Sequence, residues 1–338
     1  MTHHTEARSH PLTPATVLAL VSALLLGLTA CATATDGERS SVVVTTNILG
    51  DITREIVGDQ AEVTVLMKPG ADPHSFGVSA PQAARFEQAD LIVHNGLGLE
   101  ENVLRHVEAA RESGVATLAV GEGVDPLPYA SDDMAGRPDP HFWTDPTRVR
   151  TAARLIADQL VEHVDGVDAS TVRANAARYD TRLADLAHWM SSRFAAIPAN
   201  KRNLVTNHHV FGYLAQRFGF HVIGAVIPSG TTLASPSASD LTSLATAIEK
   251  AGVTAIFADS SQPDRLAQVL KRESDVDVRV LPLFSESLTE RGKGAATYLE
   301  MMRANTAAIA DGLGAPTPTP TPTPSTARPM AGTERETP

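Results

Sequence analysis

The stretch that decides the fold is residues 170–196, STVRANAARYDTRLADLAHWMSSRFAA. Apolar side chains recur in it at steps of three and four residues, and they are Val172, Ala176, Tyr179, Leu183, Leu186, Met190 and Phe194. This spacing places them on one face of a helix. We expect that helix to stop before Pro198 and to span roughly 40 Å, at about 1.5 Å per residue. A rod of this length can join two lobes without a soft hinge.

Short β-branched runs lie on both sides of this helix, and helical patterns alternate with them. Four runs precede it, at 42–44, 63–66, 91–93 and 115–120, and four follow it, at 204–205, 222–227, 256–257 and 278–281. Alternation at this spacing predicts βαβ units and parallel sheets. The expected fold class is therefore α/β, with two lobes that each hold a four-stranded parallel sheet flanked by helices. One long rigid helix joins them, and a last helix is expected at about 295–313.

Composition limits the function classes. The chain has 338 residues, enough for two medium domains, and a formal net charge of −11. Nucleic-acid binding requires clustered Lys and Arg, so this acidic balance argues against a nucleic-acid partner. Cys31 is the only cysteine, which excludes an internal disulfide and a site built from several thiolates. A metal site in this chain must therefore use His, Asp or Glu.

The N-terminus has the pattern of an export signal. The apolar run at 15–29 is too short to span a bilayer and fits the core of a signal peptide. It ends in Leu28-Thr29-Ala30-Cys31, which resembles a bacterial lipobox and implies cleavage before Cys31 and acylation of its thiol. Two acyl chains would anchor the protein outside the cell membrane. The alternative is a plain signal peptide with an incidental cysteine.

Three histidines and one glutamate stand after predicted strands or in the loop before the helical middle. They are His74, His141, His208 and Glu286. Ligands of α/β sheets bind at the carboxyl ends of the strands, so these side chains can meet across a cleft. Imidazole and carboxylate suit zinc or manganese, and three His with one carboxylate fill a tetrahedral zinc shell. The spacing of these residues does not by itself establish a metal site, because each His taken singly also fits a structural or surface role.

Several stretches resemble the metal-specific solute-binding lipoproteins of bacterial zinc and manganese ABC importers, the cluster A-I family. The resemblance covers nearly all of 42–311, and its motifs are KPGADPHSF, ADLIVHNGLGLE, DPHFWTDP, HHVFGYLAQRFG, IFADSS and TYLEMMRAN. It implies two α/β lobes joined by a rigid helix, and delivery of the captured metal to the membrane permease of an ABC importer. It also implies that the metal ligands are His74, His141, His208 and Glu286.

The predicted organisation follows from these features. It comprises a signal peptide (1–30), a lipidated tether (31–40), an N-terminal metal-binding lobe (41–146), a helical region with the linking helix (147–199), a C-terminal metal-binding lobe (200–314) and a disordered Pro/Thr-rich tail (315–338). We expect a monomer.

The sequence departs from the family pattern in ways that leave choices open. The fourth ligand is usually Asp, and Glu286 is one methylene longer, which makes Asp259 a rival. His209 stands where many relatives have Asp, and it competes with His208. The region 122–138 has no His, so it lacks the His-rich loop of many zinc-specific relatives. Three imidazoles and one carboxylate are nevertheless softer than the set associated with manganese relatives, and they favour Zn²⁺, with Mn²⁺ as the alternative.

Two other function classes compete with metal delivery. A zinc hydrolase would use three His and an activated water, but His-Glu-x-x-His, Gly-x-Ser-x-Gly and phosphate-loop motifs are absent from the sequence. We therefore expect no enzyme. A surface adhesin is compatible with the lipid anchor and the Pro/Thr-rich tail, and adhesion would be a secondary role.

Overall fold

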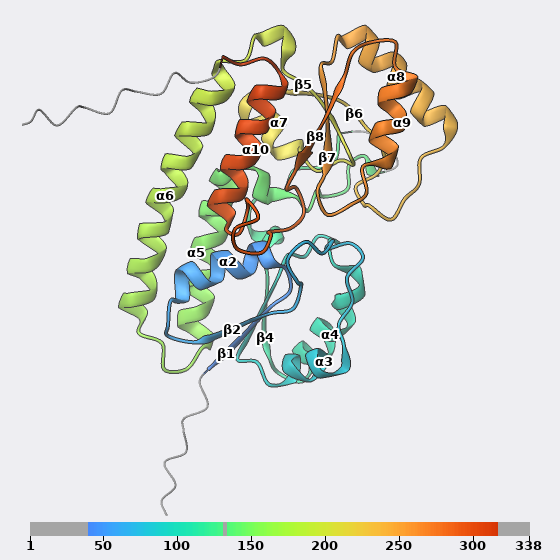
Figure 1. Cartoon of the computed structure of the whole chain (residues 1–338). Helices are drawn as coiled ribbons and strands as arrows, with labels where there is room; N and C mark the ends of the chain where they lie inside the picture. Colours follow the sequence, from blue (N-terminus) through green and yellow to red (C-terminus); the bar gives the residue numbers. More distant parts are fainter. Residues whose placement is uncertain (1–39, 131–133, 317–338) are drawn as a thin grey trace, which may run out of the picture. The chain divides into compact units, whose positions relative to one another are not determined.

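The computed structural model describes residues 40–130 and 134–316. The predicted signal peptide, Cys31, nearly all of the tether and nearly all of the tail lie outside these residues. Two parallel four-stranded sheets form (Figure 1). The first comprises β1 (Ser41–Val44), β2 (Glu62–Val65), β3 (Leu91–His94) and β4 (Ala116–Ala119), and the second comprises β5 (Asn203–Thr206), β6 (His221–Ala225), β7 (Ala255–Asp259) and β8 (Arg279–Leu283). The predicted fold class is confirmed.

Helices cover both sheets. They are α2 (Asn47–Val57), α3 (Ala80–Glu87), α4 (Glu101–Glu112), α5 (Pro146–His163), α6 (Ala169–Ala195), α7 (Gly212–Phe218), α8 (Ala238–Ala251), α9 (Arg265–Glu273) and α10 (Tyr298–Gly312). Short 3-10 turns occur at Val120–Gly123, Phe142–Thr144 and Ala199–Lys201. Both sheets have the same order, β2-β1-β3-β4 and β6-β5-β7-β8. The chain runs outward in opposite directions from β1 and β3 in the first sheet, and from β5 and β7 in the second. Such a switch in strand order opens a crevice at the carboxyl ends of the strands.

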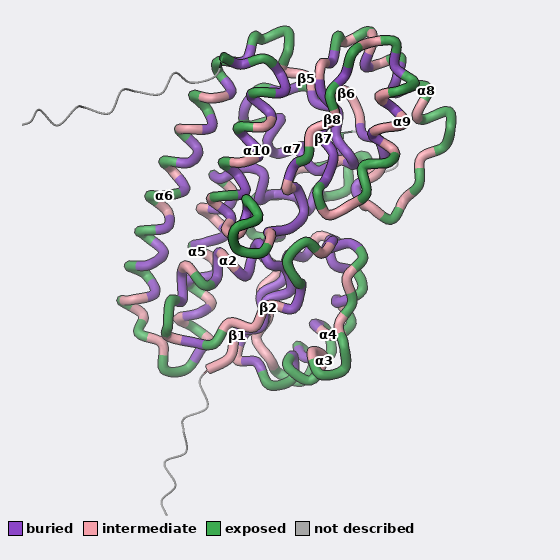
Figure 2. The backbone as a smooth tube through the Cα atoms, in the orientation of Figure 1, coloured by how far each residue is buried: buried purple, intermediate pink, exposed green. Residues whose placement is uncertain are grey.

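The predicted linking helix is α6, which has 27 residues. It begins where the Asp168 side chain accepts the Thr171 backbone N–H at 2.9 Å, a standard N-terminal cap. Its buried side chains fall on one side, as the alternating colours of Figure 2 show. That side packs against α2 and α5 in the N-terminal lobe and against α10, which in turn packs on β8. The helix therefore runs along both lobes.

The two lobes share one hydrophobic core. On β1, Val42 and Val44 face inward to α2, α5 and α6, and the same cluster continues to Phe257 and Leu283 of the second sheet. Val43 points to the opposite face, where α3 and α4 cover it. A third cluster fills the space between the second sheet and α8 and α9. Because separating the lobes would break a continuous core, the long helix acts with its neighbours rather than as an isolated rod.

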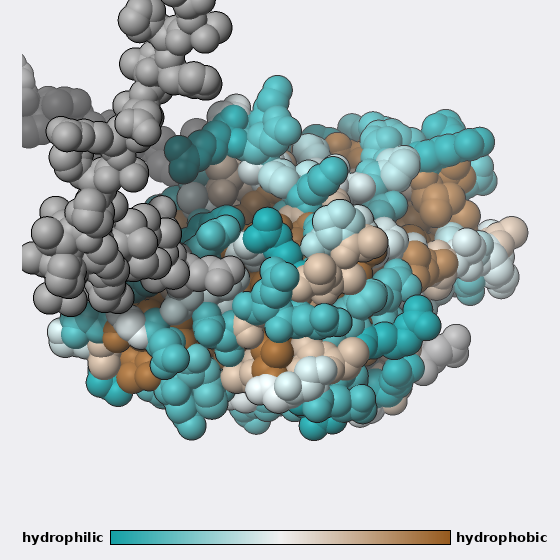
Figure 3. All heavy atoms as spheres, turned by 90° about the horizontal axis from the view of Figure 1, so that it is seen from below, coloured by the Kyte–Doolittle hydropathy of each residue, from teal (hydrophilic) through white to brown (hydrophobic). Residues whose placement is uncertain are grey.

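The face of the molecule seen from below in Figure 1 is mostly polar. Figure 3 shows a hydrophilic face with small, separate hydrophobic patches. Two large hydrophobic side chains, Val222 and Leu233, are exposed among the described residues. Within the same residues, none of the helices has the length and apolar character needed to cross a membrane.

Candidate metal centre

His74 is held by the loop that follows β2. The carboxylate of Asp72 accepts the His74 backbone N–H at 2.9 Å, which fixes the turn over Pro73. The imidazole is 4% exposed. The loop therefore directs the ring into the interior between the two sheets.

His141 is held by the loop that leads into α5. Asp139 Oδ1 accepts the His141 backbone N–H at 2.9 Å and lies 2.7 Å from the ring Nδ1. The Nδ1–H therefore donates to Asp139, and Nε2 is left with a free lone pair that points inward. A carboxylate behind a histidine in this way is typical of metal ligands, because it fixes the tautomer and the orientation of the ring.

His208 comes from the second lobe. It follows β5, where the Thr206 hydroxyl donates to the His208 carbonyl at 2.8 Å and closes the turn. The ring is fully buried, and neither of its nitrogens has a hydrogen-bond partner within the described residues. Buried polar atoms are rarely left unpaired, so this ring is short of a partner that a cation would supply.

Glu286 follows β8 and is 1% exposed. Within the described part of the chain, neither carboxylate oxygen has a hydrogen-bond partner. An isolated buried carboxylate is costly unless it is paired or coordinates a metal. Its surroundings are three imidazoles, which can share a cation with it.

These four side chains converge on one point. Each offers one ligand atom, and the four atoms lie within 4.8 Å of one another. Glu286 Oε1 lies 3.1 Å from His208 Nε2 and 3.6 Å from His141 Nε2. His74 Nε2 lies 3.4 Å from His141 Nε2. Tetrahedral bonds of about 2.0 Å separate ligand atoms by about 3.3 Å, so these distances are close to those around one bound transition-metal ion.

The protonation of the cluster follows from its burial. Burial, with His141 and His208 nearby, lowers the pKa of His74 to about 2, and burial with His141 lowers that of His208 to about 3. Burial raises the pKa of Glu286 to about 8, although His141 opposes the shift. Burial also disfavours the charged form of His141, but Glu286 and Asp139 outweigh it and raise its pKa. Burial therefore favours the neutral forms of His74, His208 and Glu286 in the metal-free site.

The rival residues lie elsewhere. Asp259 is buried, but its carboxylate accepts hydrogen bonds from the Ser285 hydroxyl and the Ser261 backbone N–H, and it is not a member of the four-residue cluster. His209 also stands outside that cluster, and its backbone N–H donates to the Ser229 carbonyl at 3.0 Å.

Comparisons with known proteins identify the family. A family model described as "Zinc-uptake complex component A periplasmic" matches residues 42–312. The chain belongs to this family. The manganese ABC transporter substrate-binding lipoprotein PsaA of Streptococcus pneumoniae is 30% identical over 308 residues, covering 88% of this chain and 98% of PsaA. The predicted family is confirmed, and it is one of solute-binding transport proteins.

Solved structures of the family share the fold. The periplasmic zinc binding protein TroA of Treponema pallidum matches with a TM-score of 0.75 at 28% identity, covering 81% of this chain and 99% of TroA. A manganese-bound periplasmic metal binding protein of Candidatus Liberibacter asiaticus gives a TM-score of 0.73 at 28% identity, with 82% and 100% covered. The zinc-uptake component A fold therefore occurs in proteins that are named for zinc and in proteins described as manganese-bound.

Residues that support the site were not all predicted. Asp72 received no role from the sequence, yet its Oδ2 accepts hydrogen bonds from Thr232 at 2.6 Å and Gln262 at 2.8 Å, both in the other lobe. The available signal was the repeated Asp-Pro-His. In both copies the Asp accepts the backbone N–H of the His two residues later, so the repeat marks one local structure.

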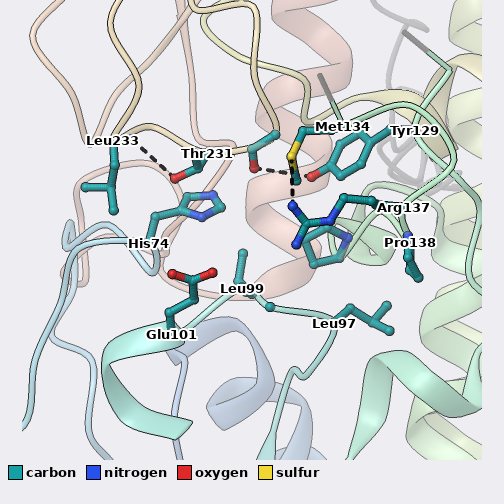
Figure 4. A pocket seen from close by; sticks show the side chains of 13 residues that line it. His74, Leu97, Leu99, Glu101, Tyr129, Met134, Arg137, Pro138, Thr231 and Leu233 are labelled. Atoms are coloured by element: carbon teal, nitrogen blue, oxygen red, sulfur yellow. Dashed lines mark hydrogen bonds between the residues drawn. The ribbon is translucent and has the colours of Figure 1, made fainter. Parts of the chain in front are cut away.

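A cavity of about 370 Å³ borders the site. Of the four clustered side chains, His74 alone lines it. Figure 4 shows the His74 imidazole at the cavity wall, with Glu101 below it and Tyr129 and Arg137 beside the same space. The Tyr129 hydroxyl donates to the Gly230 carbonyl at 3.2 Å, so residues of both lobes meet at the wall of this cavity.

Proposed function

We propose that this zinc-uptake component A protein captures one divalent transition-metal ion, with Zn²⁺ preferred, through His74, His141, His208 and Glu286. It then delivers the ion to the membrane permease of an ABC importer. The observation that carries this proposal is the convergence of four buried ligand atoms, drawn from both lobes, within 4.8 Å of one another. An ion at that point would tie the lobes together.

The donor set supports zinc. Three imidazole nitrogens and one carboxylate are borderline-soft ligands that suit Zn²⁺, whereas Mn²⁺ prefers a larger share of oxygen. Mn²⁺ is the second candidate cargo, because the relative PsaA is named for manganese and a Liberibacter neighbour is titled as manganese-bound. TroA is titled as zinc-binding.

The site's completeness supports binding rather than hydrolysis. A catalytic zinc keeps one position open for water, next to three protein ligands. Here Glu286, whose Oε1 lies 3.1 Å from His208 Nε2, would fill that position. Membership in a family of solute-binding transport proteins points the same way.

The proposal includes an extracytoplasmic location. Lipid on Cys31 would anchor the protein to the cell membrane and keep it near its permease. PsaA is named as a lipoprotein, which supports this part of the proposal. The same proposal includes the predicted organisation of the chain, which comprises a signal peptide, a tether, two metal-binding lobes around the helical region, and a tail.

Competitive titration with a chromogenic chelator tests the metal site. The chain without residues 1–31 is compared with His74→Ala, His141→Ala, His208→Ala and Glu286→Gln, for Zn²⁺ and Mn²⁺ separately. Each change should weaken Zn²⁺ binding by more than about 100-fold. Loss of a residue that only hydrogen-bonds to a metal ligand costs up to about 100-fold, and loss of the ligand itself should cost more.

Asp259→Asn tests the rival ligand, because it alters a buried carboxylate that is bonded to Ser285, the residue before Glu286. It should weaken zinc binding by less than about tenfold. The ligand assignment is wrong if Asp259→Asn is the more damaging carboxylate change. The cargo assignment is wrong if the unmodified chain binds Mn²⁺ more tightly than Zn²⁺.

A further inference from the structure

The Glu286 carboxylate has no hydrogen bond of its own to direct it. Both oxygens lack a partner among the described residues, whereas the His141 ring is held by Asp139. A glutamate also has one more rotatable bond than an aspartate, and fixing such a side chain costs conformational entropy. Its position must therefore be set by packing and by the backbone that carries it.

Asn47 holds that backbone on one side. This residue opens α2 in the N-terminal lobe and is 7% exposed. Its Nδ2 donates to the Ser287 hydroxyl at 2.7 Å and to the Lys68 carbonyl at 3.1 Å, and its Oδ1 accepts the Leu288 backbone N–H at 2.9 Å. One amide group therefore ties residues 287–288 to the N-terminal lobe.

Asn305 holds the backbone on the other side. It lies on α10 and is 3% exposed. Its Oδ1 accepts the Phe284 N–H at 2.9 Å, and its Nδ2 donates to the Phe284 carbonyl at 2.9 Å. Between the two asparagines, the Trp143 indole N–H donates to the Ser285 carbonyl at 2.8 Å.

We propose that Asn47 and Asn305 are positioning residues that clamp residues 284–288 and thereby aim the Glu286 carboxylate at the metal. This inference rests on the proposed function, because it takes Glu286 to be a ligand. Asn47 pairs with buried groups of residues 287–288, and Asn305 pairs with the partly buried backbone of Phe284, so losing either amide leaves polar groups of the segment without these partners.

The clamp joins the segment that carries Glu286 to both lobes. Glu286 follows a strand of the second sheet, yet Asn47 and the Gly70 N–H, which donates to the Leu288 carbonyl at 2.9 Å, bind its segment to the first lobe. The clamp thus holds the Glu286 segment from both lobes, between His74 and His141 of the first lobe and His208 of the second. Preorganisation of this kind lowers the ordering cost of binding.

A double-mutant cycle tests the clamp. Asn47→Ala and Asn305→Ala are each made in the unmodified chain and in Glu286→Gln, and Zn²⁺ affinity is measured by chelator competition. Ser287→Ala is a further variant that breaks the Asn47 contact from the loop and leaves α2 intact. Asn175→Ala is the matched control, since this buried asparagine donates to the Ile56 carbonyl at 2.9 Å, away from Glu286. Thermal unfolding of the metal-free proteins checks that each variant is folded.

Each clamp variant should weaken Zn²⁺ binding by about tenfold or more in the unmodified chain, and by less than about threefold when Glu286 is already Gln. Asn175→Ala should change affinity in neither background. Equal losses in the two backgrounds would overturn the clamp, because the asparagines would then act without Glu286. An unchanged affinity in Glu286→Gln alone would instead overturn the ligand assignment itself, and the clamp with it.

Discussion

Asp72 Oδ2 accepts a hydrogen bond from Thr232 Oγ1 at 2.6 Å, and this bond joins the loop of His74 to the loop after β6 in the other lobe. Gln262 Nε2 donates to the same oxygen at 2.8 Å. The other oxygen of Asp72 holds the His74 backbone. One carboxylate therefore fixes a ligand loop and fastens the two lobes beside it.

Thr232→Val should accelerate zinc release. The change keeps the shape of the side chain and removes the donor to Asp72, so the contact between the two lobes loses a charge-assisted bond of about 1.5 kcal/mol. We expect the dissociation rate to rise about tenfold, measured by mixing the loaded protein with excess chelator in a stopped-flow instrument.

The neighbouring Thr231 provides the control. Its hydroxyl accepts the Leu233 N–H at 3.3 Å within its own loop rather than bonding to the other lobe. Thr231→Val should leave the dissociation rate within about twofold. Equal zinc dissociation rates for the two variants would mean that the bond between Thr232 and Asp72 does not slow zinc release.

Asp139→Asn should weaken zinc binding by about 10- to 100-fold, the range typical of residues behind a metal-bound histidine. The amide can still accept the His141 backbone N–H, but it removes the negative charge behind the ring Nδ1–H and can present its NH₂ there instead. Chelator competition measures the loss. The Asp145→Asn variant changes a cap of α5 and should bind zinc with unchanged affinity.

Zinc binding should release a proton and tighten with pH. Burial raises the pKa of Glu286 to about 8, so below that pH the ion must displace a proton from the Glu286 carboxyl group. Affinity should rise about tenfold per pH unit between pH 6 and 8 and level off above it. Calorimetry in buffers of different ionisation enthalpy measures the proton count, and a count of zero at pH 7 would contradict this protonation scheme.

Asp51 should make the metal-free protein less stable above pH 6. Burial raises its pKa from 3.8 to about 6, although the Tyr298 N–H donates to the carboxylate at 2.8 Å. Because the folded pKa lies above the unfolded one, the stability that this group contributes is present below about pH 4 and is lost as pH rises through 6. Asp51→Asn should therefore raise the free energy of unfolding at pH 7 by about 1–2 kcal/mol, reduced for partial exposure, and change little at pH 4.

Asp168 should have the opposite effect on the free energy of unfolding, and it serves as the control. The Thr171 and Ser170 side chains hydrogen-bond its carboxylate and lower its pKa to about 2. Asp168→Asn should lower stability at pH 7, since the ionised cap stabilises the start of α6. Urea denaturation at pH 4 and 7 measures both variants, and a stabilising Asp168→Asn would contradict the linkage argument.

The fold was predictable because its signals are local. The run Val42-Val43-Val44 is buried on both faces, and the apolar spacing of α6 repeats over many turns. Helix α10 begins at Tyr298, not at about residue 295, because the Thr297 hydroxyl accepts the Glu300 N–H at 3.2 Å and caps the helix there. Propensity alone places such an end only to within a few residues.

The site was less accessible to sequence reasoning, because its contacts are distant in the chain. The four candidate ligands were picked out by their places after predicted strands and in the loop before the helical middle, and family resemblance implied that they bind the metal, which is what we propose. Asn47 and Leu288 are separated by 241 positions, and no local pattern pairs them. Asp72 and Thr232 are separated by 160. Such bonds depend on how two lobes pack on one shared core.

A crystal structure of the zinc-loaded protein, with anomalous diffraction at the zinc edge, tests the central claim most directly. We expect one peak about 2.0–2.2 Å from the Nε2 atoms of His74, His141 and His208 and from a carboxylate oxygen of Glu286. A peak bound by residues of a single lobe, or by Asp259 in place of Glu286, would contradict the account.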